Sequence, residues 1–408
     1  MSIPSRYGGL EVPDKVCKQP TGLLSIISNG GAFRTGMRPT LLFFSVEIFG
    51  SFLLLHYICV RKMNGSSIVR GWRTLLAAIG GIVVSMLFCL CSPADKGERG
   101  EPMNAAYYWS TVFDLDSAQL AFIREQHVGR IYLRYFDVVM KDGMPMPNAT
   151  VQFAGNKPDG VEVVPTIYIL NNCMEQDHTD LDSLLLSRIL QMSETHDMGR
   201  IREIQLDCDW TKQTCGNYFA LLERLKERAK AHNIRLSATI RLHQLSQPTP
   251  PVDRGVLMMY NTGDVTKFDG TDPILDMHDV KPYLRYLKDY DLPLSTAYPV
   301  FAWQVVFRKG DGQRSKVKGL RSEGAWRYIG ILHRDDYLPI LPDDSIVVRQ
   351  PTPDMVRQAR QAVDSLRPDA NREVILYDIS RQNIQRIKQY HYEKVIFPSP
   401  AGSGTRTE

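Results

Sequence analysis

The chain has 408 residues, of which 43% are hydrophobic and 23% charged, a balance typical of a globular protein with a sizeable core. Its formal net charge of +4 is small for this length, and no basic stripe is interleaved with aromatic residues, so we expect no nucleic-acid partner. Cys173, Cys208 and Cys215, the cysteines beyond residue 92, form no C-x-x-C pair and indicate neither a zinc site nor a disulfide framework. We expect no cofactor.

Two apolar runs dominate the N-terminal region. The first, residues 41–60, is long enough to span a bilayer. The second, residues 75–91, follows basic residues, ends at Cys91 and then turns abruptly polar. This layout resembles a bacterial lipoprotein signal in which Cys91 carries the lipid, although Leu90 stands where a small residue is usual.

The N-terminal region has two interpretations. If translation begins at Met63, residues 1–62 are not part of the protein and residues 63–92 form the signal. Otherwise the two apolar runs form a membrane hairpin, and the basic residues between them stay cytoplasmic. Both interpretations place the rest of the chain in the cell envelope, outside the cytoplasmic membrane, attached through a lipid or an N-terminal helix.

After a linker at residues 93–104, strand and helix patterns alternate. Residues 202–244 read as a strand, a long amphipathic helix and a second strand. The other predicted strands cover residues 106–113, 130–139, 161–169, 255–261, 294–303 and 372–380. The other predicted helices cover residues 118–126, 182–192, 280–290, 354–366 and 381–391.

Three segments depart from regular alternation. Residues 140–160 are rich in Gly, Pro and Asn, so we expect the second helix to be missing or replaced by a hairpin. The prolines of residues 246–255 exclude a fifth helix. Residues 309–350 form a long insertion with small strands of its own, such as residues 345–349. The tail, residues 398–408, is expected to be disordered.

Eight strands separated mostly by helices, with no internal repeat, predict one α/β domain over residues 105–397: a single (β/α)8, TIM-like barrel, irregular at helices 2 and 5. A doubly wound open sheet is the alternative, but the chain has no Gly-rich phosphate loop after an early strand.

Side chains alternate across the two strands of residues 202–244. One face of the first strand carries the polar residues Gln205, Asp207 and Asp209. One face of the second carries Ser237, Thr239, Arg241 and His243. The opposite faces are apolar and suit packing against helices. In a closed parallel barrel the polar faces line the lumen and the C-terminal mouth, where barrel enzymes build their sites.

Two short motifs resemble family 18 glycoside hydrolases, the chitinase-like barrels. LDCDW at residues 206–210 resembles their D-x-D-x-E signature, and MMYN at residues 258–261 resembles their M-x-Y-D/N. The region also resembles a group of exported bacterial barrel proteins. The resemblance implies a carbohydrate substrate, with Asp209, Asp207 and Tyr260 as catalytic residues.

The signature differs at one decisive position. Thr211 stands where the family has its proton-donating Glu, and a threonine hydroxyl cannot protonate a glycosidic oxygen at neutral pH. Either another carboxylic acid replaces it, or the barrel binds without cleaving. Asp137 and Asp378 end the second and eighth predicted strands, and two close carboxylates such as Asp207 and Asp209 can also supply an acid.

The remaining polar candidates have alternative roles. His243 acts as a general base or sugar ligand, or is structural. Arg241 binds an anionic sugar or neutralises Asp209, in which case Asp207 accepts hydrogen bonds in the lumen. Asp207, Asp209 and His243, all near one mouth of the barrel, could hold a divalent metal ion. No H-x-H or H-E-x-x-H spacing supports such a site, so no metal site is predicted.

Aromatic residues near the predicted C-terminal strand ends favour sugar binding, because the apolar faces of sugars stack on rings. They are Trp109, Trp210, Tyr260 and Trp303. Tyr260 and Asn261 are expected to position the substrate and Trp303 to stack on it. Any single ring more often serves core packing, but four at one rim favour sugar binding.

Two functions follow. The first is a membrane-associated, glycoside hydrolase-like enzyme acting on carbohydrate through Asp207 and Asp209. The second is a non-catalytic barrel that binds glycan or scaffolds an envelope complex.

Overall fold

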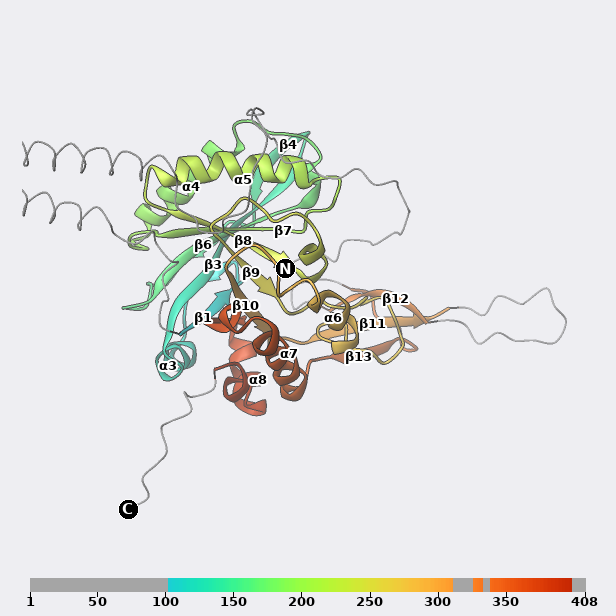
Figure 1. Ribbon diagram of the computed structural model, residues 1–408. Helices are drawn as coiled ribbons and strands as arrows, with labels where there is room; N and C mark the ends of the chain where they lie inside the picture. Colours follow the sequence, from blue (N-terminus) through green and yellow to red (C-terminus); the bar gives the residue numbers. More distant parts are fainter. Residues whose placement is uncertain (1–101, 311–325, 333–337, 398–408) are drawn as a thin grey trace, which may run out of the picture. The chain divides into compact units, whose positions relative to one another are not determined.

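The computed structural model describes residues 102–310, 326–332 and 338–397 (Figure 1). The predictions for residues 1–92, including lipidation of Cys91, and for the tail concern parts of the chain outside these ranges. Within the described ranges, every helix is too short or too polar to span a bilayer.

Eight parallel strands close into a barrel, because β1 is hydrogen-bonded to both β3 and β14. In barrel order the strands are β1 (Met103–Tyr108), β3 (Val128–Lys141), β6 (Glu162–Ile169), β7 (Glu203–Cys208), β8 (Arg235–Arg241), β9 (Arg254–Met258), β10 (Leu294–Pro299) and β14 (Glu373–Tyr377). The predicted barrel is confirmed, and the open sheet is excluded.

Helices cover the outside of the barrel (Figure 1). They are α3 (Ser117–Glu125), α4 (Leu181–Thr195), α5 (Cys215–Lys230), α6 (Met277–Leu284), α7 (Pro353–Leu366), α8 (Arg381–Tyr390) and α9 (Glu393–Ile396), with short 3-10 turns η1 (Asn171–Met174), η2 (Leu242–Ser246) and η3 (Pro368–Asn371). Helix α7 begins as its sequence predicts, with Pro353 in its first turn and the Thr352 side chain accepting a hydrogen bond from the Met355 amide.

Both predicted irregularities are confirmed. Strand β4 (Met144–Asn148) turns back antiparallel on β3 where a second helix would stand. The segment between β8 and β9, which is described throughout, contains only η2. The first predicted strand is divided into β1 and β2 (Val112–Phe113), and β2 pairs with β5 (Gln152–Phe153).

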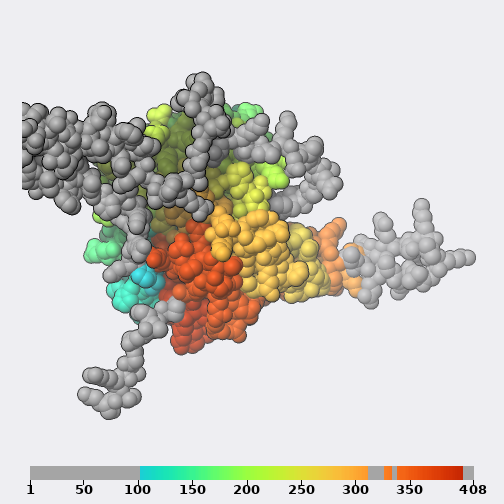
Figure 2. Space-filling view, viewed as in Figure 1, coloured from blue at the N-terminus to red at the C-terminus, as the bar shows by residue number. Residues whose placement is uncertain are grey.

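The insertion forms a separate antiparallel sheet of β11 (Trp303–Lys309), β12 (Trp326–Ile331) and β13 (Ser345–Arg349), in the order β12-β11-β13. The strand predicted at residues 345–349 is confirmed. The predicted seventh strand ends earlier than expected, at Pro299, so Trp303 begins the insertion instead. In Figure 2 the yellow surface before the insertion adjoins the red C-terminal surface, and the orange surface of the insertion lies beyond the yellow one.

The barrel has an outer core between strands and helices and an inner core inside the lumen. The side chains of β7 alternate between the two. Ile204 and Leu206 belong to the same buried cluster as Leu222 of α5, whereas the Tyr107 hydroxyl donates a hydrogen bond to Gln205 inside the barrel (2.7 Å). The predicted division of polar and apolar faces is therefore confirmed for this strand.

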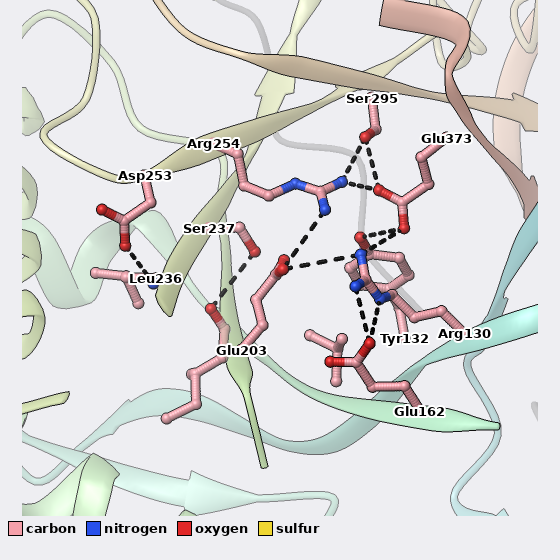
Figure 3. Close-up of polar contacts among 12 residues, drawn as sticks. Arg130, Tyr132, Glu162, Glu203, Leu236, Ser237, Asp253, Arg254, Ser295 and Glu373 are labelled. Atoms are coloured by element: carbon pink, nitrogen blue, oxygen red, sulfur yellow. Dashed lines mark hydrogen bonds and ion pairs between the residues drawn. The ribbon is translucent and has the colours of Figure 1, made fainter. Parts of the chain in front are cut away.

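An ionic layer fills the N-terminal end of the lumen (Figure 3). It is made by Glu203, Arg254, Glu373 and Arg130, which begin β7, β9 and β14 and lie near the start of β3. Arg130 lies 2.8 Å from Glu373 and 3.9 Å from Glu203. Arg254 contacts Glu373 directly and lies 3.5 Å from Glu203. Opposite charges on alternate strands thus form a ring, at the end of the barrel that usually serves stability.

Candidate functional site at the barrel mouth

The guanidinium group of Arg241 contacts two carboxylates at the C-terminal mouth of the barrel. Arg241 lies 2.9 Å from the Asp207 carboxylate and 4.0 Å from the Asp209 carboxylate. Thr239 donates a hydrogen bond to the same Asp207 oxygen (2.7 Å). Arg241 therefore lies closer to Asp207 than to Asp209, the carboxylate that the sequence suggested as its partner. Asp207 is the closer partner because it lies inside the lumen, 2% exposed, whereas Asp209 follows the end of β7.

His243 brings a titratable group to Asp209. It lies on η2, with Nε2 3.8 Å from Oδ1 of Asp209, and a little over a third of its side chain is exposed. Burial lowers the pKa of His243 below its ordinary value of 6.5; Asp209 opposes this shift and Arg241 reinforces it. The imidazole is therefore neutral at pH 7 and able to accept a proton or a hydrogen bond.

The lowered pKa of His243 predicts a pH dependence of stability. The folded protein binds the His243 proton less readily than the unfolded chain, so the free energy of unfolding should fall as the pH drops from about 6.5 toward the folded pKa. Chemical denaturation across this range should show that His243→Gln removes part of the slope. The control His278→Gln, at a fully exposed position, should leave it unchanged. An identical slope in both variants would contradict the assignment.

An aromatic cluster lines the inner wall next to these charges. The ring of Tyr260 lies 4.7 Å from that of Tyr377, and Phe301 lies 5.4 Å from Trp303. Trp109 also belongs to the cluster and Trp303 packs against it, so three of the four aromatic candidates meet there. The Tyr260 hydroxyl is buried and has no hydrogen-bond partner among the described residues, and burial keeps its pKa far above the ordinary value. It is therefore a protonated donor inside the lumen.

Trp210 lies elsewhere, contrary to expectation. It is buried in the outer core, where its ring packs edge-on against Phe219 of α5 at 5.2 Å. The reason is the alternation of the chain beyond β7, which turns Asp209 toward the mouth and Trp210 toward the helix. Asn261 is exposed and has a left-handed backbone (φ 55°).

The two other carboxylate candidates are already engaged. Arg134 contacts both carboxylate oxygens of Asp137, one of them at 2.7 Å. Strand register aligns Asp137 with Tyr168 and Tyr168 with Asp207, so both carboxylates lie at one level of the lumen. Asp378 instead accepts hydrogen bonds at the start of α8, from the Ser380 amide (3.0 Å) and the Asn383 side chain (2.6 Å), and burial raises its pKa.

Position 211 carries a hydroxyl group where the family has its carboxylic acid. Thr211 is exposed, and its amide donates a hydrogen bond to the Thr214 hydroxyl (2.9 Å) just before α5. Among the described residues, no group of three or more His, Cys, Asp or Glu is placed to hold a metal ion.

Several mouth residues were missed by sequence reasoning: Tyr107, Arg134, Tyr168, Phe301 and Tyr377. Tyr168 and Tyr377 could have been found by extending the alternation of side chains to β6 and β14. Arg134 could not, because an irregularity in the register of β3 falls between it and Asp137.

No protein-family model matches the sequence. No curated protein matches it either. Among solved structures, the chain is similar to the spore cortex-lytic enzyme SleL of Bacillus megaterium QM B1551 (12% identity, 72% of this chain, 75% of that chain, TM-score 0.42). It is also similar to a chitinase of Chromobacterium violaceum (11% identity, 71% of this chain, 99% of that chain, TM-score 0.43). A third similar structure is a Group IV chitinase of Ostrinia furnacalis (10% identity, 73% of this chain, 97% of that chain, TM-score 0.44). Similarity of this extent assigns no activity.

Proposed function

We propose that this chain binds carbohydrate at the C-terminal mouth of its barrel. The observation that carries the proposal is the buried Tyr260 hydroxyl, a donor without a partner among the described residues, set within a cluster of aromatic rings. Sugars present apolar faces that stack on rings and hydroxyl groups that accept and donate hydrogen bonds. Asp209 and His243, both partly exposed beside this cluster, supply further polar partners.

Binding without cleavage fits the carboxylates better than hydrolysis does. Glycosidases of the two-carboxylate type need one carboxylic acid that donates a proton to the leaving oxygen. Asp137 and Asp207 are each in direct contact with a guanidinium group, Asp378 accepts hydrogen bonds at the start of α8, and Thr211 offers no carboxylic acid. The site therefore resembles that of a glycoside hydrolase that binds sugar without cleaving it.

Hydrolysis is the second candidate function, favoured by the pairing of Asp209 with a neutral imidazole at 3.8 Å. Such a pair can exchange a proton with a substrate or a water molecule. Under this alternative Asp209 and His243 donate and accept the protons, and Arg241 neutralises the Asp207 carboxylate.

The test combines binding and cleavage. The full chain and Asp209→Asn are titrated calorimetrically with oligomers of N-acetylglucosamine, cello-oligosaccharides and peptidoglycan glycan fragments, and released reducing ends are assayed in parallel. We expect binding without new reducing ends, and a Kd about tenfold higher for Asp209→Asn because the charge-assisted hydrogen bond to the sugar is weakened. Asp369→Asn, on the exposed surface, is the control.

Cleavage that Asp209→Asn abolishes would establish the second candidate. Failure of every glycan to bind the unaltered chain would reject both functions and leave the scaffold alternative.

We further propose that the protein is exported and held at the membrane through its N-terminal region. The support is the sequence alone: basic residues, the apolar run of residues 75–91 and then Cys91. In cells fed a labelled fatty acid, the protein should carry the label and Cys91→Ser should lose it. Retention in the membrane without label would instead support the hairpin of residues 41–60 and 75–91.

A further inference from the structure

Gln244 joins the two segments that carry the mouth charges. Its side chain is fully buried on η2. Its Oε1 accepts a hydrogen bond from the Arg241 amide (2.8 Å), and its Nε2 donates one to the Trp210 carbonyl (3.2 Å). One side chain therefore connects the end of β8 to the residue that follows Asp209.

This connection stands beyond the point where the two strands pair. The register of β7 and β8 ends at Leu206 opposite Ala238. Asp209 and His243 both lie past that last pair, on separate loops, so the strand ladder does not set the distance between them. The hydrogen bonds of Gln244 bridge the two loops at this point.

We propose that Gln244 is a positioning residue that fixes the separation of Asp209 and His243 and thereby the affinity of the mouth for glycan. The affinity part rests on the proposed function. The positioning part does not, because the surroundings of His243 can be measured without any ligand.

The chain contains a matched control in Gln119. This side chain is also buried, its Oε1 accepts from the Asp116 amide three residues earlier (2.9 Å), and its Nε2 donates to the Ile379 carbonyl (2.7 Å). It therefore makes the same two kinds of hydrogen bond as Gln244, but it joins the start of α3 to the segment before α8. Neither of its partners belongs to the aromatic cluster or to the charges around Asp209.

The experiment compares Gln244→Met with Gln119→Met in the full chain. Methionine keeps the length of the side chain but removes both hydrogen bonds, so each variant leaves equivalent backbone groups without a partner and similar losses of Tm are expected. The His243 titration is followed by nitrogen NMR of the imidazole ring. Affinity for an N-acetylglucosamine hexamer is measured by calorimetry.

Only Gln244→Met should change the site. Its His243 pKa should rise toward the ordinary value, because a loosened η2 exposes the imidazole to water, and its Kd for the hexamer should rise about tenfold, as expected for one misplaced hydrogen bond. An unchanged His243 titration in Gln244→Met, or equal changes in both variants, would overturn the proposal.

Two further provisions keep the test decisive. If Gln244→Met does not fold, Gln244→Asn is measured against Gln119→Asn with the same two criteria, because the shorter amide stays uncharged but cannot reach both partners. If the unaltered chain does not bind the hexamer, the failure counts against the proposed function, and the His243 titration still decides whether Gln244 positions the imidazole.

Discussion

Glu373→Ala is expected to destabilise the protein by about 3–5 kcal/mol, the cost of removing one partner from a buried ion pair. Glu373 is 7% exposed and accepts contacts from Arg130 and Arg254. It also accepts hydrogen bonds from the side chains of Ser295 (2.7 Å) and Tyr132 (3.1 Å). Its loss would leave two guanidinium groups and two hydroxyl groups without their shared acceptor in the lumen.

Denaturation with urea at pH 7 would measure this effect. Glu125→Ala, on the exposed side of α3, is the control and should change the free energy of unfolding by no more than about 0.5 kcal/mol. A loss below about 1 kcal/mol for Glu373→Ala would mean that the ionic ring does not stabilise the barrel.

Arg241→Leu should affect both stability and binding. Because it leaves the buried Asp207 carboxylate without its guanidinium partner, we expect a loss of about 3–5 kcal/mol in the free energy of unfolding. Glycan binding should be abolished, since the same group lies against Asp209 and sets the charge of the mouth.

Arg357→Leu is the matched control for Arg241→Leu. It removes an exposed guanidinium group that pairs with Asp354 on α7, and such surface pairs contribute about 0–1 kcal/mol. Glycan binding retained by folded Arg241→Leu would contradict the role of this arginine in the site.

The barrel could be predicted from the sequence because its strands and helices follow simple periodicities. Alternation with period two placed Asp207 and Arg241 in the lumen, and the structure brings them into contact. The same rule, continued for two residues, would have turned Trp210 outward. Its expected place at the rim came from its proximity to a strand end rather than from its face of the strand.

The ionic layer could not be predicted, because its members appear in the sequence as isolated charges at strand starts. Glu203 and Glu373 each begin a strand, where a charged residue commonly faces solvent. Only the order of strands around the closed barrel shows that Arg130 and Arg254 fall between them. Asp378 also needed the structure, because the Ser380 and Asn383 groups that engage it become its partners only when α8 forms.

A crystal structure of the full chain with a bound N-acetylglucosamine oligomer would test the central claim most directly. We predict a sugar ring against the cluster that contains Tyr260 and Trp303, with a sugar hydroxyl within hydrogen-bond distance of Asp209. An oligomer bound at another face of the barrel, with the mouth empty, would contradict the account.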